Sequence, residues 1–154
     1  MQEMRLNVIR QPGEAHIFEL RDSLRRHNFS RIGEYPLAGE RDFQSFLITH
    51  RSEQDELVGG LFAFIRFGWM VVDLLWVHES QRRRGLGGQL LQNIEHIGLQ
   101  QGIKRYRLNT ASFQTGLALY QRHGYEIFAE LPSISMHDGK LTEFTDYYMK
   151  KEIG

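Results

Sequence analysis

Three arginines followed by closely spaced glycines make residues 82–88 the segment of this sequence best suited to chemistry. The run Arg82-Arg83-Arg84-Gly85-Leu86-Gly87-Gly88 follows a strongly apolar segment and opens one with helical spacing of apolar residues. The first turn of a helix has free backbone N–H groups and the positive end of the helix dipole. Glycine lets a ligand approach that backbone closely, and arginine adds forked donors for phosphate. We call residues 82–88 the arginine–glycine loop and predict that it binds a pyrophosphate.

Other phosphate-binding motifs fit this loop less well. A P-loop would need a lysine directly after the glycines, and none follows them. A dinucleotide-binding fingerprint would need a third glycine where Leu90 stands, within an early strand–helix–strand unit. The remaining alternative is a solvated charged turn in front of an ordinary helix. The apolar strand before the loop and the long helix after it argue against that alternative.

A carboxylate stands inside the apolar segment that precedes the loop. Asp73 lies in Trp69–Val77, which is otherwise apolar and is predicted to be a central strand covered on both faces. Burying an unpaired carboxylate is costly. Asp73 is therefore expected either to have a functional role or to be bonded to an arginine, a tyrosine or the backbone.

Metal and thiol chemistry find no support in the residue types. The sequence has no cysteine, which excludes disulfides, thiolate metal sites and a cysteine nucleophile. Its 7 histidines show no ligand spacing and no His-Glu-x-x-His pattern. We therefore expect no metal site.

The elements that must position the loop follow from hydrophobic periodicity. Leu86–Gln101 is predicted to be a helix because its apolar residues line one face, and Gly102 stands where such a helix should end. Together with the strand Trp69–Val77, the pattern indicates a mixed sheet with helices packed on it. The other predicted elements are the strands Arg5–Ile9, Phe43–Thr49, Leu57–Phe67, Arg105–Asn109, Tyr125–Leu131 and Glu143–Lys151, the helices Glu14–Arg26 and Thr115–His123, and a loop at Asn28–Asp42.

Length and composition indicate one soluble domain over residues 1–154. The chain has 154 residues, of which 41% are hydrophobic and 25% charged, as in ordinary globular proteins. The formal net charge is zero, which argues against nonspecific binding to nucleic acid. No apolar stretch is long enough to span a membrane, and the first residues lack the apolar core of a signal peptide. We therefore expect a cytoplasmic protein.

The arginine–glycine loop and its setting resemble motif A of the GNAT acetyltransferases. Residues Arg82 to Gly87 follow that family's pattern Arg/Gln-x-x-Gly-x-Gly/Ala, and Tyr120–Tyr125 resembles its Tyr-x-x-x-Gly-Phe/Tyr run. The resemblance extends over essentially the whole chain. The segments 73–77 and 108–114 are similar to a bacterial subgroup with unassigned substrates. The resemblance implies an α/β (mixed α+β) GNAT fold, with a central mixed sheet of six to seven strands flanked by about four helices.

The resemblance also implies acetyl-CoA as the cosubstrate and no metal. In the family, the pyrophosphate sits on the amides of this loop, and the pantetheine arm runs along the preceding strand. A backbone N–H near Leu75 or Trp76 would then polarise the thioester carbonyl. The cofactor-binding residues implied in this way are Leu75, Trp76, Val77, Arg82, Arg83, Arg84, Gly85, Leu86, Gly87, Gly88 and Gln114.

Two residues are candidates for proton transfer in the family reaction, in which a neutral amine attacks the thioester directly. Tyr120 would donate a proton to the leaving thiolate, since its spacing from Gly124 matches the family's tyrosine. The alternative is that Tyr120 is a core aromatic residue whose hydroxyl has a partner. Asp73 would accept the amine proton through water, unless it is only a buried, bonded carboxylate.

The acceptor and the assembly are left open by the sequence. By resemblance, the acceptor enters between residues 28–42 and 131–145, whose mixed charges select no particular amine. A small molecule, an amino acid and a peptide all remain candidates. A non-catalytic acyl-CoA sensor is the alternative function, and nucleic-acid binding is disfavoured by the neutral charge. A homodimer is compatible with the sequence, because most small soluble oligomers are symmetric pairs.

Overall fold

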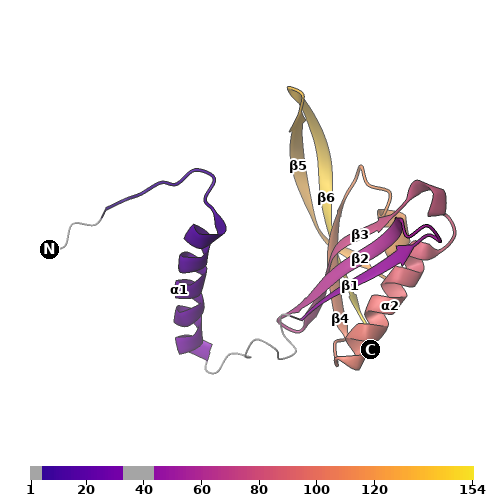
Figure 1. Ribbon diagram of the computed structural model, residues 1–154, viewed down its shortest axis with the longest axis horizontal. Helices are drawn as coiled ribbons and strands as arrows, with labels where there is room; N and C mark the ends of the chain where they lie inside the picture. Colours follow the sequence, from indigo (N-terminus) through magenta and orange to yellow (C-terminus); the bar gives the residue numbers. More distant parts are fainter. Residues whose placement is uncertain (1–4, 33–43) are drawn as a thin grey trace. The chain divides into compact units, whose positions relative to one another are not determined.

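The computed structural model describes residues 5–32 and 44–154, which belong to two compact units (Figure 1). The first unit contains helix α1 (Glu14–Ile32). The helix predicted over Glu14–Arg26 is confirmed and continues into the predicted loop Asn28–Asp42, of which residues 33–42 lie outside the described residues. The strand predicted at Arg5–Ile9 is wrong, because these residues pair with no strand in the described chain. A single domain over residues 1–154 remains a prediction.

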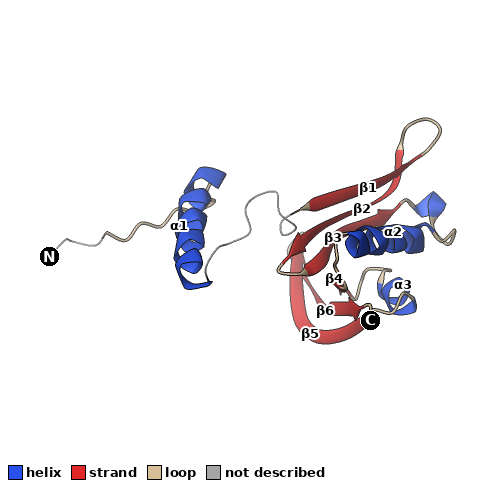
Figure 2. Cartoon of the chain, turned by 90° about the horizontal axis from the view of Figure 1, so that it is seen from below, coloured by secondary structure: helices blue, strands red, loops and turns tan. Residues whose placement is uncertain are grey.

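The second unit is built on a six-stranded mixed sheet (Figure 2). Its strand order is β1-β2-β3-β4-β6-β5, and the β3–β4 pair is parallel whereas the other pairs are antiparallel. Its elements are β1 (Ser45–Arg51), β2 (Leu57–Arg66), β3 (Trp69–Val77), a 3₁₀ turn (Glu79–Gln81), α2 (Leu86–Gln100), β4 (Arg105–Ala111), α3 (Leu117–Arg122), β5 (Glu126–His137) and β6 (Lys140–Glu152). The predicted mixed fold is confirmed with six strands, and the described residues form three α-helices where about four were expected.

Helix α2 connects the parallel strands β3 and β4 and packs against the sheet (Figure 2). A parallel pair requires such a crossover, because its strands cannot be joined by a tight turn. Leu90, Leu91 and Ile94 are buried in the core that α2 shares with the sheet, as the apolar spacing predicted. The helix ends at Gln100, and Gly102 takes a φ of 72°, a conformation that favours glycine.

Strand β3 contains a bulge at Asp73. In its pairing with β2, Ala63 lies opposite Val72 and Phe62 lies opposite Leu74, so Asp73 is the extra residue. Before the bulge, Met70 and Val72 are buried, whereas beyond it Leu74 is 61% exposed and Trp76 is 45% exposed. Within residues 44–154 taken by themselves, this strand is therefore not covered on both faces as predicted.

The parallel pairing of β3 with β4 is short. It covers Trp69–Val71 opposite Arg105–Arg107 and then stops, although β3 continues to pair with β2 as far as Val77. Strand β4 meanwhile continues to pair with β6 as far as Ala111. Beyond Val71, β3 therefore pairs with β2 alone among the described residues. Its other edge lies where β3 and β4 diverge.

A buried ion pair ties α2 to β6. Lys151 Nζ lies 2.9 Å from both carboxylate oxygens of Glu95, and the Tyr125 hydroxyl donates to Glu95 Oε1 at 3.3 Å. The Tyr106 hydroxyl donates to the backbone oxygen of Glu95 at 2.8 Å. Glu95 is buried, and it is thus satisfied by residues from three different strands or strand ends. This cluster fixes α2 against the sheet on the side of α3.

We expect the protein to lose stability as the pH rises above about 10, the ordinary tyrosine pKa. Burial, and then the charge of Glu95, raises the pKa of Tyr106 to about 12, and burial also raises the pKa of Tyr120 and of Tyr125. Above pH 10 the unfolded chain releases tyrosine protons that the folded chain retains, so the folded state is progressively disfavoured. Urea unfolding at pH 8.5 and pH 10.5 checks this, and equal midpoints would contradict it.

Strands β5 and β6 form a long hairpin through a two-residue turn. Asp138 and Gly139 have φ values of 48° and 73°, as the turns that suit twisted hairpins require. Residues 131–137 and 140–145, which the sequence placed at the acceptor entrance, pair as strands along most of their length.

Candidate active site

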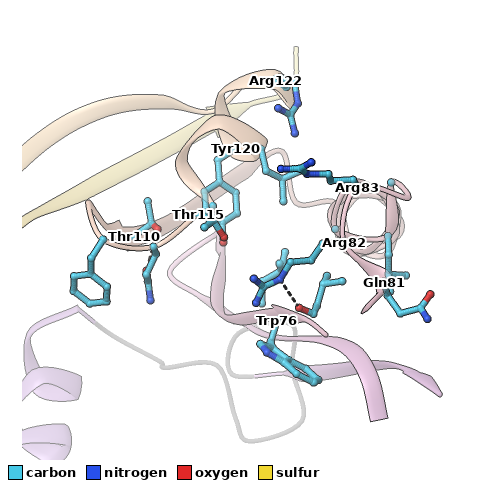
Figure 3. A pocket seen from close by; sticks show the side chains of 18 residues that line it. Trp76, Gln81, Arg82, Arg83, Thr110, Thr115, Tyr120 and Arg122 are labelled. Atoms are coloured by element: carbon cyan, nitrogen blue, oxygen red, sulfur yellow. Dashed lines mark hydrogen bonds between the residues drawn. The ribbon is translucent and has the colours of Figure 1, made fainter. Parts of the chain in front are cut away.

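A pocket lies between the end of β3, the arginine–glycine loop, the end of β4 and helix α3 (Figure 3). All the predicted cofactor-binding residues except Arg84 line it, and so does Tyr120, whereas Asp73 does not. The residues that line it are Leu75, Trp76, Val77, Gln81, Arg82, Arg83, Gly85, Leu86, Gly87, Gly88, Thr110, Phe113, Gln114, Thr115, Gly116, Leu119, Tyr120 and Arg122.

The backbone of the arginine–glycine loop presents the start of α2 to this pocket. Gly85 precedes the helix with a φ of 79°, and no side chain caps the helix there. The first N–H groups of α2 are therefore available to a ligand, at the positive end of the helix dipole. Arg83 also takes a positive φ, 62°, which is unusual for a residue with a side chain. Such a turn of backbone suits an anion, as the sequence predicted for this loop.

The three arginines of the loop differ in their surroundings. Arg82 donates from Nε to the backbone oxygen of Val77 at 3.1 Å, which ties the loop to the end of β3 (Figure 3). Arg83 lines the pocket, and Arg84 is exposed and does not line it. The contact predicted for Arg84 is through its backbone N–H, which belongs to the same loop, and it remains a prediction.

Gly87 and Gly88 let α2 and α3 approach closely. A Cβ atom on Gly87 would lie 2.8 Å from Leu119 Cδ2, and one on Gly88 would lie 2.6 Å from His123 Nε2. Both distances are shorter than real contacts, so a side chain at either position requires the Leu119 or His123 side chain to move. The sequence assigned these glycines only to the approach of a phosphate, and the structure adds this packing role, which depends on contacts distant in the chain.

Replacing Gly88 by alanine is expected to reduce stability by about 1–3 kcal/mol, because the new methyl group overlaps the His123 ring. CoA affinity should fall as well, since α2 and α3 border the same pocket. Urea unfolding and calorimetric titration measure the two effects. The double variant Gly88→Ala/His123→Ala makes room for the methyl group and should recover much of the lost stability. A single variant as stable as the wild type would contradict the packing role.

The free edge of β3 borders the pocket along Leu75, Trp76 and Val77. Leu75 and Val77 pack against the core, whereas the indole ring of Trp76 contacts the imidazole ring of His78 edge to face at 5.9 Å. An extended ligand could pair with the backbone here as an added strand, which is how sheet edges commonly bind peptide-like chains. The placement fits the predicted role of these residues with the pantetheine arm, whose two amides resemble a peptide backbone.

Gln114 closes the turn after β4. Its Oε1 atom accepts from the backbone N–H of Ala111 and from the hydroxyl of Thr110, both at 3.0 Å. These two bonds hold the amide group at the pocket wall with its nitrogen as the remaining donor. The side chain is thus both a structural element of the turn and a donor that a ligand in the pocket could use.

Tyr120 lies on α3 with its hydroxyl directed into the pocket (Figure 3). Its side chain is only 8% exposed, and burial raises the pKa of its phenol above the ordinary value of 10.0. The ring contacts Tyr125 edge to face at 6.1 Å and lies against Gly116, where a Cβ would be 2.8 Å from Cε2. The phenol is therefore protonated at neutral pH and held in one position, as a proton donor must be.

Asp73 lies elsewhere. The expectation of a buried carboxylate is wrong, because the bulge leaves the Asp73 side chain exposed, so it needs no compensating partner. Its role as the base remains a prediction. The bulge depends on pairing with β2, which the apolar run around Asp73 does not reveal.

Arg122 was missed as a pocket residue in the sequence. It lines the pocket from the last position of α3, although it stands only two residues after Tyr120. It is one charge among many in the sequence, and only the fold brings it to the pocket.

Within residues 5–32 and 44–154, no group of three or more histidine, aspartate or glutamate side chains could hold a metal ion. None of the helices in these ranges is both long and apolar enough to span a bilayer.

Comparison with known proteins gives consistent similarities. The family model described as "Acetyltransferase (GNAT) family" matches residues 14–125. A blasticidin-S acetyltransferase from Streptomyces morookaense is 33% identical over 98 residues, which are 63% of this chain and 71% of that protein. The crystal structure of an acetyltransferase from Bacillus cereus superposes with a TM-score of 0.73 at 22% identity, covering 96% of this chain and 98% of that one. A GNAT family acetyltransferase from Elizabethkingia anophelis with acetyl-CoA bound superposes with a TM-score of 0.57 at 21% identity, covering 71% and 76%.

Proposed function

Because the chain belongs to the acetyltransferase (GNAT) family, we propose that it transfers an acetyl group from acetyl-CoA directly to a primary amine. The observation that carries the proposal is that one pocket contains three parts suited to this cosubstrate. These parts are the uncapped start of α2 for the pyrophosphate, the free edge of β3 for the pantetheine arm, and the buried phenol of Tyr120 near both. The acetyl-CoA bound to the Elizabethkingia anophelis acetyltransferase supports the choice of cosubstrate.

The proposed reaction has one bond-forming step. The lone pair of the neutral amine attacks the thioester carbon, the C–S bond breaks, and the sulfur leaves as a thiolate. Tyr120 donates its phenolic proton to that sulfur, and the amine nitrogen loses a proton to water or to a base. Backbone N–H groups at the edge of β3 can stabilise the oxyanion formed during attack. Water then returns a proton to Tyr120.

The acceptor is proposed only as a class. The relative that acetylates blasticidin S supports a small-molecule amine, and an amino acid or a peptide remains a candidate. We propose no nucleic-acid or membrane partner. A cytoplasmic location and a homodimer remain predictions from the sequence, which cell fractionation and sedimentation analysis would test.

Calorimetric titration of acetyl-CoA and desulfo-CoA, followed by a thiol-release screen with a panel of amines, tests the proposal. We expect both ligands to bind and at least one amine to release CoA thiol. The panel should contain blasticidin S, polyamines, amino acids and short peptides. If both ligands bind but no amine in the panel releases CoA thiol, the result would favour a non-catalytic acyl-CoA sensor. No binding by the folded protein would contradict the assignment of the pocket.

A further inference from the structure

Arg122 adds a cation to the pocket from a different element than the arginine–glycine loop. It is the last residue of α3, its side chain is exposed, and it lines the pocket together with Arg83. Figure 3 shows both arginines at the end of the pocket away from Trp76. We infer that Arg122 binds the 3′-phosphate of CoA and makes the enzyme discriminate against dephospho-CoA. This inference rests on the proposed function.

The pyrophosphate already has donors that do not include Arg122. The first N–H groups of α2 have no side-chain cap, and Gly85, Gly87 and Gly88 bring this backbone into the pocket wall. Such a helix start is a sufficient site for a pyrophosphate. Arg82 completes that region but is bonded through Nε to Val77. A cation on the neighbouring helix is therefore available for a further negative group of the same ligand.

The 3′-phosphate is the most strongly charged group that CoA could offer. As a phosphate monoester it carries about −1.5 to −2 charges at pH 7, whereas each phosphate of the pyrophosphate bridge carries one. A guanidinium matches such a group with paired N–H donors. Because Arg122 is exposed, little desolvation opposes this contact. An exposed position at the rim also suits the 3′-phosphate, which lies at the outer, ribose end of the cosubstrate.

Arg122 forms no ion pair with a carboxylate among the described residues. The ion pairs there engage Arg26, Arg51, Lys150 and Lys151 among the arginines and lysines, and none engages Arg83 or Arg122. A free guanidinium at the rim of a ligand pocket retains its full attraction for an anion. Arg83 is in the same state but belongs to the arginine–glycine loop, whereas Arg122 comes from α3 and is left over once the loop holds the pyrophosphate.

The test is a calorimetric comparison of CoA with dephospho-CoA in the wild type and in Arg122→Gln. We expect the wild type to bind dephospho-CoA about tenfold more weakly than CoA, because it loses about the free energy of one charge-assisted hydrogen bond. Arg122→Gln should weaken CoA binding by about the same factor and leave dephospho-CoA within about twofold. Arg122→Lys should retain part of the discrimination. The matched control is Arg107→Gln, an exposed arginine on β4 that does not line the pocket and should change neither affinity.

Two results would overturn the inference. Equal weakening of both ligands in Arg122→Gln would mean that Arg122 acts on the pyrophosphate or on the shape of the pocket. Equal binding of CoA and dephospho-CoA by the wild type would mean that the 3′-phosphate has no partner. Both results would leave the proposed function intact, whereas failure of the wild type to bind either ligand would refute the proposed function as well.

Discussion

Tyr120→Phe is expected to lower kcat by about two orders of magnitude, the lower end of the range for general acid catalysis. The phenol is the proposed proton donor; it lines the pocket, and burial keeps its pKa above the ordinary value. The affinity for acetyl-CoA should stay within about twofold, because the ring and its contacts with Tyr125 and Gly116 are retained. Steady-state kinetics with a saturating amine and calorimetric titration measure the two quantities.

The matched control is Tyr125→Phe. Tyr125 is also buried and contacts the Tyr120 ring, but its hydroxyl donates to Glu95 and it does not line the pocket. That variant should lose stability while its kcat changes by less than about threefold. A raised pKa keeps the Tyr120 phenol protonated to higher pH. Deprotonation of Tyr120 should therefore cause no decline in the wild-type kcat up to about pH 9.5. Wild-type turnover in Tyr120→Phe would remove this residue from the mechanism.

Removing the Glu95 carboxylate is expected to reduce the free energy of unfolding by about 2–3 kcal/mol. Glu95→Ala leaves the ammonium of Lys151 and the hydroxyl of Tyr125 without the partner that they share in a mostly buried place. The side chain of Lys151 is 21% exposed, so water can reach it in part, which is why we place the loss below the full value for a buried pair. Urea unfolding monitored by tryptophan fluorescence measures the change.

A second ion pair on the same strand provides the control. Lys150 lies 3.7 Å from Glu126, and this pair is largely exposed, so Glu126→Ala should cost less than about 0.5 kcal/mol. Replacing both members of the buried pair, as Glu95→Leu/Lys151→Met, should cost less than Glu95→Ala alone, because no charge is left without a partner. Equal losses in Glu95→Ala and Glu126→Ala would show that the buried pair contributes no more than an exposed one.

The elements with strong local patterns could be predicted from the sequence. Helix α2 follows from its apolar spacing and from Gly102, and the arginine–glycine loop at its start follows from the position of its glycines. Strand β3 was predicted with the bounds observed, because its apolar run ends at polar residues on one side and at Gly68 on the other. In each case the information lies within about twenty residues.

Features that depend on pairing between distant segments could not be predicted. The bulge at Asp73 is a property of the register between β2 and β3, and it changes the expected buried carboxylate into an exposed one. The position of Arg122 at the pocket depends on how α3 packs against α2. The strand expected at Arg5–Ile9 has alternating residues, but no partner strand exists for it in the described chain. Local alternation alone does not determine a strand.

Because one edge of β3 is free beyond Val71, a bound ligand can supply the missing hydrogen-bond partner of that strand. A cosubstrate that pairs with this edge binds the folded chain and not the unfolded one, so its concentration enters the folding equilibrium. At a hundred times its Kd, such a ligand adds about 2.7 kcal/mol to the free energy of unfolding. The melting temperature would then report acetyl-CoA concentration, and the amides of Leu75–Val77 would exchange their hydrogens more slowly when acetyl-CoA is abundant.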